Sequence, residues 1–147
     1  MATNNMTDLA EQLNNEHIDI IDKYWSAFSF GVTSSEGQAI MRKALNAFFS
    51  HIFREEHELC QILLAAAEKN AQIASSLSQL NRDVLSLTKV IIDSFGEFMS
   101  SYNAETRYYY RQIMYTILNR VSVEEHWLTR YNQVFNLFTP TQAQTRH

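Results

Sequence analysis

A histidine and a carboxylate stand one helical turn apart near the middle of the chain. His51 and Glu55 are four positions apart, so on a helix both side chains point the same way. An imidazole nitrogen and a carboxylate oxygen on one face can ligate a metal ion. The stretches HIFREEHEL and RVSVEEHWL are alike and form a weak internal repeat. In the second stretch Arg120 takes the place of the histidine, and Glu124 corresponds to Glu55.

This pattern resembles that of hemerythrin-like domains, which are four-helix bundles with a di-iron site. The resemblance implies that four of the iron ligands are His17, His51, Glu55 and Glu124. The sequence differs from the hemerythrin-like pattern in two places. Residues 76–101 should supply a histidine but contain none, with Asn81 nearest, and Arg120 replaces the last histidine. A site that lacks two imidazoles and holds an arginine is unusual for iron, so the alternative is a solvated, charged helix face.

Other catalytic chemistry has little support in the sequence. Cys60 lies in an apolar run beside Leu59 and Ile62, where a thiol is expected to be a core residue rather than a reactive thiolate. The sequence contains no glycine-rich phosphate loop. The two EEH triplets hold acid–base groups, but no second convergent group accompanies them. We therefore expect a protein that is not an enzyme.

Long helices must position these residues, because the chain has few residues that interrupt helices. Its 147 residues include three Gly and one Pro, and 46% are hydrophobic. Apolar residues recur at spacings of three and four. We expect an all-α fold, with one domain over 7–138 between a disordered start at 1–6 and a linker or tail at 139–147.

Capping signals and one charged run predict the helix boundaries. Two capping boxes, S/T-x-x-E/Q, mark helix starts. The charged run REEHE, 54–58, predicts a bend or short loop. The expected N-caps are Thr7, Thr33, Ser76 and Asn103. The expected helices cover 7–30, 36–70 with the bend inside it, 76–100 and 103–138.

The last expected helix carries a heptad pattern that only Glu124 interrupts. At 1.5 Å per residue, its roughly 35 residues would span about 50 Å, more than a compact domain of this size needs. This favours a homodimer or a rod that leads to a further domain, and the alternative is a bundle helix packed within one subunit. The residues expected in the dimer seam are Val121, Leu128, Tyr131 and Phe135.

Charge and cysteine content narrow the expected partners and compartment. The net charge is −4, and the basic residues are scattered, which argues against nucleic-acid binding. One cysteine excludes an internal disulfide and fits a reducing compartment. The sequence shows neither a secretory signal nor an apolar stretch long enough to cross a bilayer. We expect a cytoplasmic protein without a membrane partner.

The stretch AEKNAQIASSLSQLNRDVLSLTKVIIDSF combines a helix end, a corner of small residues and a long apolar helix. Together with Trp25 and the final helix RYYYRQIMYTILNRVSVEEHWLTRYNQVF, it resembles globin-coupled sensors and the N-terminal domains of RsbR-type stressosome proteins. The resemblance implies a dimeric, globin-like sensor domain for stress signalling. It also implies a STAS-type domain in the full protein and STAS-domain scaffold proteins as partners in a larger complex.

In such sensors a histidine that binds haem aligns with Asn70, whose amide is a poor ligand for haem iron. His57 lies thirteen residues earlier, close to a whole number of helical turns, and is the first candidate haem ligand. His51 is a second candidate, and Phe53 would help to wall the pocket. With haem the domain would sense oxygen or another diatomic gas. Without haem it would bind another small molecule, or act as a cofactor-free helical regulator that binds proteins.

Overall fold

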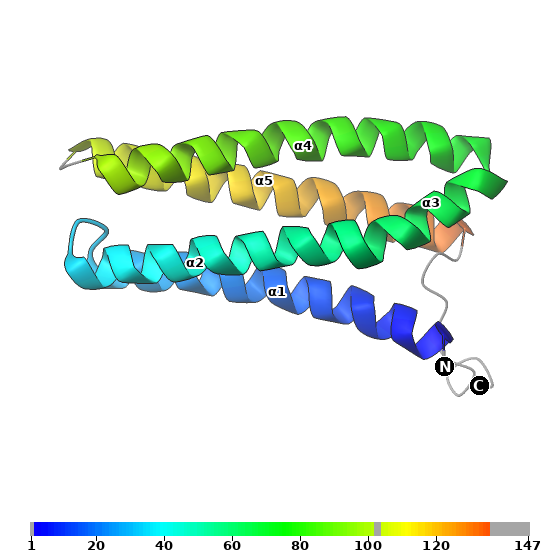
Figure 1. Ribbon diagram of the computed structural model, residues 1–147, viewed down its shortest axis with the longest axis horizontal. Coiled ribbons are helices and arrows are strands. Elements are labelled where there is room, and N and C mark those ends of the chain that lie inside the picture. The colour runs from blue at the N-terminus through cyan, green and yellow to red at the C-terminus, as the bar shows by residue number, and fades with distance from the viewer. Residues whose placement is uncertain (1, 102–103, 136–147) are drawn as a thin grey trace.

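Four long helical rods lie side by side in the computed structural model, which describes the backbone over residues 2–101 and 104–135 and the side chains over 9–101 and 105–132 (Figure 1). The elements are α1 (Ala2–Phe30), α2 (Ser35–Arg54), η1 (Glu55–Leu59), α3 (Cys60–Lys69), α4 (Ala71–Ser100) and α5 (Ala104–Phe135). The second rod consists of α2, the π-helical η1 and α3, which follow one another without a break. The predicted all-α fold is confirmed.

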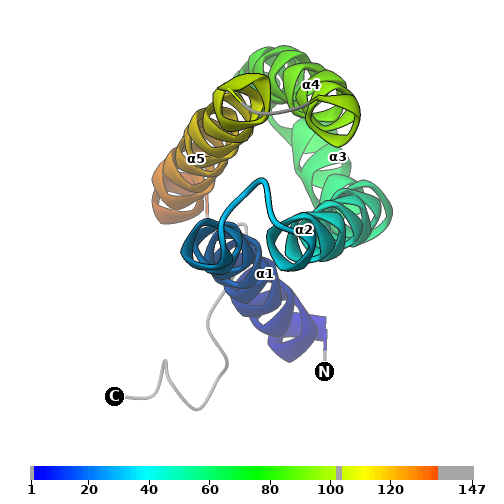
Figure 2. The ribbon, with the colours of Figure 1, turned by 90° about the vertical axis from the view of Figure 1, so that its left-hand side faces the viewer.

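Successive rods are neighbours, which makes this an up-and-down bundle. Contacts join α1 to α2, α3 to α4, α4 to α5, and α5 back to α1. Viewed along the bundle in Figure 2, the rods surround a common interior. Globin helices instead pack pairwise at steep angles of about 50°. The globin-like detail of the expected fold is therefore not confirmed.

The observed starts of α1 and α2 differ from the starts that the capping signals predicted. The backbone of α1 is helical from Ala2, so the helix does not start at the expected Thr7 cap. The disordered start expected at 1–6 stays a prediction. α2 begins at Ser35, and the cap is Ser34 rather than Thr33. Ser34 Oγ accepts the Gly37 N–H at 2.9 Å, because the extended backbone at Ser34 turns its side chain toward the first helical turn.

The predicted loop at 54–58 is also wrong, because the chain stays helical there. Without Gly or Pro in this run, nothing stops the helix, and it widens into one π-helical turn. The wider turn suits inward side chains at a spacing of four. His51, Glu55 and Leu59 consequently all face the interior, while Glu56, His57 and Glu58 remain exposed.

Helix α4 begins at Ala71 instead of Ser76, and Asn70 is its cap. Asn70 Oδ1 accepts the N–H groups of Gln72 at 2.9 Å and Ile73 at 3.1 Å. Ser76 lies inside α4, with its Oγ 2.6 Å from Tyr131 Oη. The expected Asn103 cap and the expected helix end at 138 lie outside the described residues.

Two apolar clusters fill the bundle, one toward each end. Buried side chains of the first are Ile20, Tyr24, Ala27, Val32, Met41, Ala44, Phe48, Ile91, Phe95, Phe98, Tyr110, Ile113 and Ile117. Those of the second are Leu9, Leu13, Leu59, Leu63, Ile73, Leu77, Leu80, Trp127 and Tyr131. Each large apolar side chain that is fully buried contributes about 1.5–3 kcal/mol by leaving water. These clusters hold the rods in register around the polar residues that lie between them.

Three residues expected in a dimer seam pack inside the chain. Val121 packs against the first cluster, while Leu128 and Tyr131 belong to the second. The side chain of Phe135 lies outside the described residues. The heptad face of α5 is thus occupied within one subunit, which was the alternative interpretation of that pattern. The homodimer stays a prediction.

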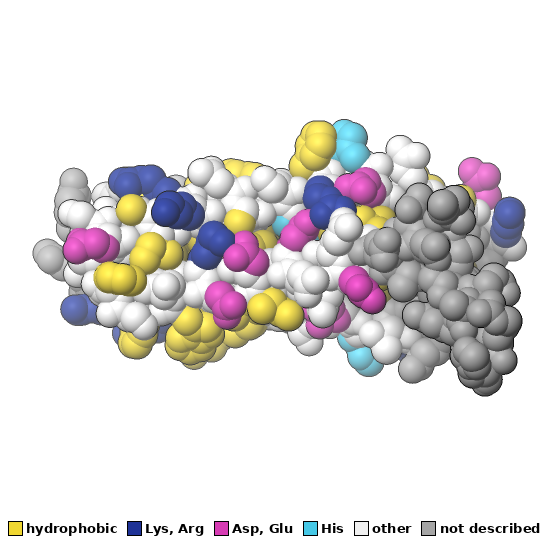
Figure 3. Space-filling model, turned by 90° about the horizontal axis from the view of Figure 1, so that it is seen from below, with side chains coloured by type: hydrophobic (Ala, Val, Ile, Leu, Met, Phe, Trp, Pro, Cys, Tyr) yellow, Lys and Arg dark blue, Asp and Glu magenta, His cyan; other side chains and the backbone are white. Residues whose placement is uncertain are grey.

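The length and apolar character of the helices and the charges on the surface bear on membrane crossing and nucleic-acid binding. Over the described residues, no helix combines the length and apolar character that crossing a membrane requires. Acidic and basic side chains are interspersed over the described part of the face in Figure 3. Nucleic-acid binding surfaces instead gather Lys and Arg.

Candidate metal centre

Four ionisable side chains from three rods meet between the two apolar clusters. They are His17 from α1, His51 from α2, Glu55 from η1 and Glu124 from α5. Each is at most 6% exposed. One nitrogen or oxygen atom from each lies within 4.8 Å of the corresponding atoms of the others. The structure thus brings together all four ligands that the hemerythrin-like resemblance implied, and they do not form a solvated face.

Both imidazole rings turn their Nε2 atoms toward this centre. His17 Nε2 lies 3.0 Å from His51 Nε2. Glu124 Oε1 is 3.1 Å from His17 Nε2 and 3.9 Å from His51 Nε2. Glu55 Oε2 is 2.8 Å from His51 Nε2. Two nitrogens and two carboxylate oxygens therefore face one small volume.

Two further carboxylates orient the rings from outside. His17 Nδ1 is 2.7 Å from Glu125 Oε2, and His51 Nδ1 is 2.8 Å from Glu16 Oε1. An ionised carboxylate only accepts hydrogen bonds, so each Nδ1–H donates outward. With one proton on Nδ1, a neutral ring has its lone pair on Nε2, toward the centre. Metal-binding histidines in proteins are commonly held in this way.

A second proton on His51 alone does not satisfy the facing atoms. If His51 carries a second proton, its Nε2–H faces three acceptors, namely His17 Nε2, Glu124 Oε1 and Glu55 Oε2. It can donate well to one of them, and the other lone pairs still face each other. Glu55 Oε2 accordingly has no hydrogen bond although it is buried 2.8 Å from His51 Nε2. A cation at the centre would satisfy all four atoms at once.

The electrostatics also favour positive charge at the centre. Burial lowers the pKa of His51, but contacts with Glu124, Glu55 and Glu16 outweigh burial and raise it to about 10. For Glu124, burial raises the pKa, yet hydrogen bonds from His17 and His51 hold it well below its ordinary value. Burial raises the pKa of Glu55, and the nearby Glu124 adds to this effect.

Arg120 is a fixed cation on one side of the cluster. Its Nη2–H donates to Glu55 Oε1 at 2.7 Å, and its Nε–H donates to Thr88 Oγ1 at 2.9 Å. Its guanidinium carbon lies 5.4 Å from the ring centre of Phe48. Arg120 is only 3% exposed, so it neutralises part of the buried negative charge. α4 contributes Thr88 to this arrangement, while Asn81, the residue expected nearest to the missing histidine, is exposed.

The distances suit a transition metal. Ligand nitrogens and oxygens lie about 2.0–2.2 Å from such an ion, which places neighbouring ligand atoms about 3.0 Å apart in octahedral geometry and about 3.4 Å apart in tetrahedral geometry. The observed separations lie in and around this range. They are 3.0 Å between the two Nε2 atoms, 2.8 Å for His51–Glu55, 3.1 Å for His17–Glu124 and 3.9 Å for His51–Glu124. All four atoms lie within 4.8 Å of one another.

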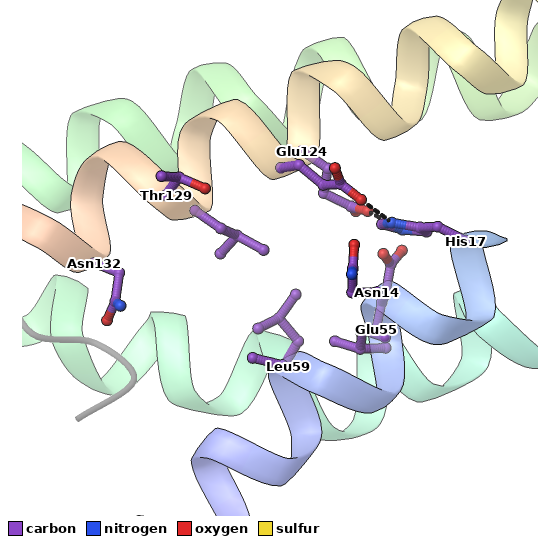
Figure 4. A pocket seen from close by; sticks show the side chains of 11 residues that line it. Asn14, His17, Glu55, Leu59, Glu124, Thr129 and Asn132 are labelled. Atoms are coloured by element: carbon purple, nitrogen blue, oxygen red, sulfur yellow. Dashed lines mark hydrogen bonds and ion pairs between the residues drawn. The ribbon is translucent and has the colours of Figure 1, made fainter. Parts of the chain in front are cut away.

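A cavity of about 450 Å³ adjoins this centre. Figure 4 shows side chains that line it. His17, Glu55 and Glu124 lie at one end, and Thr129 and Asn132 lie at the other. Ala10, Leu13, Leu59 and Leu128 also line the cavity, together with the polar side chain of Asn14 near the metal centre. Its lining consists of Ala10, Leu13, Asn14, His17, Glu55, Leu59, Glu124, Glu125, Leu128, Thr129 and Asn132.

The residues expected around haem do not come together. His57 is exposed, its ring centre 3.9 Å from that of Phe53 and its Nδ1 2.9 Å from the Phe53 carbonyl oxygen. Phe53 is itself 60% exposed, and Asn70 caps α4. The unbroken helix explains this, because two positions after the inward-facing Glu55 a side chain points outward. The prediction that His57 enters an internal pocket is wrong, and among these candidates only His51 reaches the interior.

Three supporting residues were absent from the sequence predictions. Glu16 and Glu125 orient the imidazoles, and Thr88 holds Arg120. A partial signal existed, because Glu16 precedes His17 and Glu125 follows Glu124. No such signal singles out Thr88, whose contact joins residues 32 positions apart.

Comparisons with models of known protein families, with curated proteins and with solved structures gave no match to this chain.

Proposed function

We propose that this chain binds one divalent transition metal ion inside the bundle and acts as a metal-dependent, non-catalytic sensory domain. The proposed ligands are His17 Nε2, His51 Nε2, Glu55 Oε2 and Glu124 Oε1. The observation that carries the proposal is the 3.0 Å separation of two Nε2 atoms that face each other and two buried carboxylates. Metal sites in helical bundles are built in this way, from side chains on facing helices.

Iron(II) is the first candidate ion. Imidazole nitrogens suit iron, zinc and copper, whereas carboxylate oxygens suit harder ions such as manganese and magnesium. Two imidazoles with carboxylates and open positions are typical of non-haem iron(II) sites. A reducing compartment keeps iron in this state, so we also propose the cytoplasm, with which the single Cys60 agrees.

The site is proposed to hold one ion instead of the two of hemerythrin-like domains. Arg120 donates to Glu55 Oε1, the oxygen that would bridge toward or bind a second ion. A guanidinium is always charged and would repel a cation in that place. The Arg120 position lacks the histidine of a di-iron set, and Thr88 occupies the facing part of α4. Arg120 thus takes over the electrostatic role of a second metal.

A sensory role follows from the origin of the ligands. They come from α1, the second rod and α5, so the ion would tie three rods together. A change in its occupancy or coordination would shift the packing between those rods. The resemblance to RsbR-type domains supports such a signal, with STAS-domain scaffolds as proposed partners and a homodimer as the proposed assembly. No observation specifically favours haem binding, because the side chains of His57 and Phe53 are exposed on the outer surface of the bundle.

Metal analysis tests this proposal. The chain is loaded anaerobically with iron(II), manganese(II), cobalt(II) or zinc(II), passed through a desalting column and assayed for bound metal. We expect about one ion per chain, and loss of binding in His17→Ala and His51→Ala. His57→Ala is the matched control and should bind normally. Two ions per chain would refute the single-ion site, and no retained metal in the unaltered protein would refute the proposal.

A further inference from the structure

The cavity beside the candidate metal centre is too large for a water molecule or a diatomic gas alone. Its volume is about 450 Å³, whereas a water molecule takes up about 30 Å³ of liquid. Pockets that bind small organic molecules span roughly 300–1,000 Å³. The cavity therefore has room for an organic molecule with several carbon atoms.

The end of the cavity at the metal centre favours a single negative charge. A divalent ion contributes +2, Glu55 and Glu124 contribute −2, and Arg120 contributes +1, which leaves +1. Glu125 also lines the cavity, but its side chain is 44% exposed and already accepts from His17, so water screens its charge. Glu16 lies behind His51 and pairs with Arg54. A monoanionic group at the ion would neutralise the buried charge.

The body of the cavity favours an apolar group. Leu13, Leu59 and Leu128 line it next to the metal ligands, and they belong to the second apolar cluster. Polar side chains stand at its far end, where Thr129 and Asn132 lie in Figure 4, and Asn14 is the polar side chain beside Glu55. A molecule that lies along this cavity would place its charged head at the ion and its apolar body against the leucines.

We propose that this cavity binds a monocarboxylate with a short aliphatic or aromatic body, whose head coordinates the metal ion. This inference rests on the proposed metal site. Four protein ligands leave one or two positions open on an ion of coordination number five or six, and carboxylate oxygen suits such ions. The cavity would recognise the ligand by the single negative charge at one end and by apolar contacts along the rest of the molecule.

Cobalt(II) is a suitable probe, because its visible absorption bands respond to a new ligand. The cobalt-loaded chain is titrated with acetate, with hexanoate and with hexanol. We expect hexanoate to change the bands at a concentration about ten-fold or more below that needed for acetate, since its added methylenes leave water. Hexanol has the apolar body without the charge and should leave the bands unchanged.

Substitutions in the cavity lining test where the apolar part of the carboxylate binds. Leu59→Asn and the milder Leu128→Ala should each reduce the preference for hexanoate over acetate several-fold. Leu64→Asn is the matched control, because Leu64 is 57% exposed and does not line the cavity, and it should keep the preference. Each variant is first checked for helix content and for one bound cobalt ion.

The outcomes separate this inference from the metal site. If cobalt binds but hexanoate changes nothing, or acts no better than acetate, the carboxylate pocket is refuted and the metal site stands. If both leucine variants keep the full preference, the ligand body does not occupy this cavity, and the inference is refuted. If no cobalt binds, the metal site and the carboxylate pocket fail together.

Discussion

His17 Nε2 and His51 Nε2 face each other at 3.0 Å in the core of the bundle, each ring held from behind by a carboxylate. The two residues are 34 positions apart and belong to different rods. Two buried carboxylates, Glu55 and Glu124, complete the ring of acceptors around the same point. This arrangement of facing nitrogen and oxygen atoms is the basis of the proposed metal site.

Arg120 is predicted to stabilise the metal-free chain and to weaken metal binding. Removal of one partner of a buried ion pair costs about 3–5 kcal/mol, so Arg120→Gln should lower the free energy of unfolding by that order. The freed Glu55 carboxylate should then gain more from a metal ion. Denaturant unfolding with and without zinc(II) measures both effects. Arg111→Gln changes an exposed arginine on α5 and serves as control; equal effects of the two substitutions would contradict the prediction.

Glu16 is predicted to act as a positioning residue for His51. Glu16→Ala removes the acceptor of the His51 Nδ1–H and should weaken metal affinity by about 10–100-fold, because outer carboxylates fix ring orientation and basicity. The stoichiometry should stay at one ion per chain. Competition with a metal chelator measures the affinity. Glu11→Ala removes an exposed carboxylate from the same helix and controls for net charge. If both variants lose affinity equally, only long-range charge matters.

Asn70 is predicted to matter for stability and not for any cofactor. Asn70→Ala removes the cap of α4 and should cost about 1 kcal/mol of unfolding free energy. Asn70→Asp can still accept both N–H groups and should restore most of that loss. Urea unfolding measures the change, and metal content should be unaffected in both variants. A loss of bound metal or haem in Asn70→Ala would instead assign a ligand role to this residue.

Cys60 is predicted to react slowly with alkylating agents at neutral pH. Burial raises the pKa of its thiol, and the negative charges of Glu55, Glu56 and Glu124 raise it further. The thiolate is the reactive form, so alkylation of the folded chain at pH 7–8 should be slower than in urea. The difference should shrink as the pH rises through the raised pKa. Iodoacetamide kinetics followed by mass spectrometry test this. Fast alkylation of the folded chain at pH 7 would contradict it.

Helical periodicity made the all-α fold predictable, because three- and four-residue spacing is a local property of the sequence. The same spacing placed His51 and Glu55 on one face. It could not set the helix boundaries, since Thr33, Ser34 and Ser76 all have side chains that can cap a helix. Only the turns that the packed chain adopts select Ser34 and Asn70 as caps.

What the sequence by itself determined is the helical class of this protein and the shared helix face of His51 and Glu55. His17 and Glu124 joined them only through the resemblance to hemerythrin-like domains. What the tertiary structure decided is that His17, His51, Glu55 and Glu124 converge in the interior, while His57 faces outward. The physical reason is that convergence depends on the rotation of each rod against its neighbours, including the π-helical turn at Glu55–Leu59. That rotation is set by packing of the two apolar clusters over long sequence distances, which no local pattern encodes.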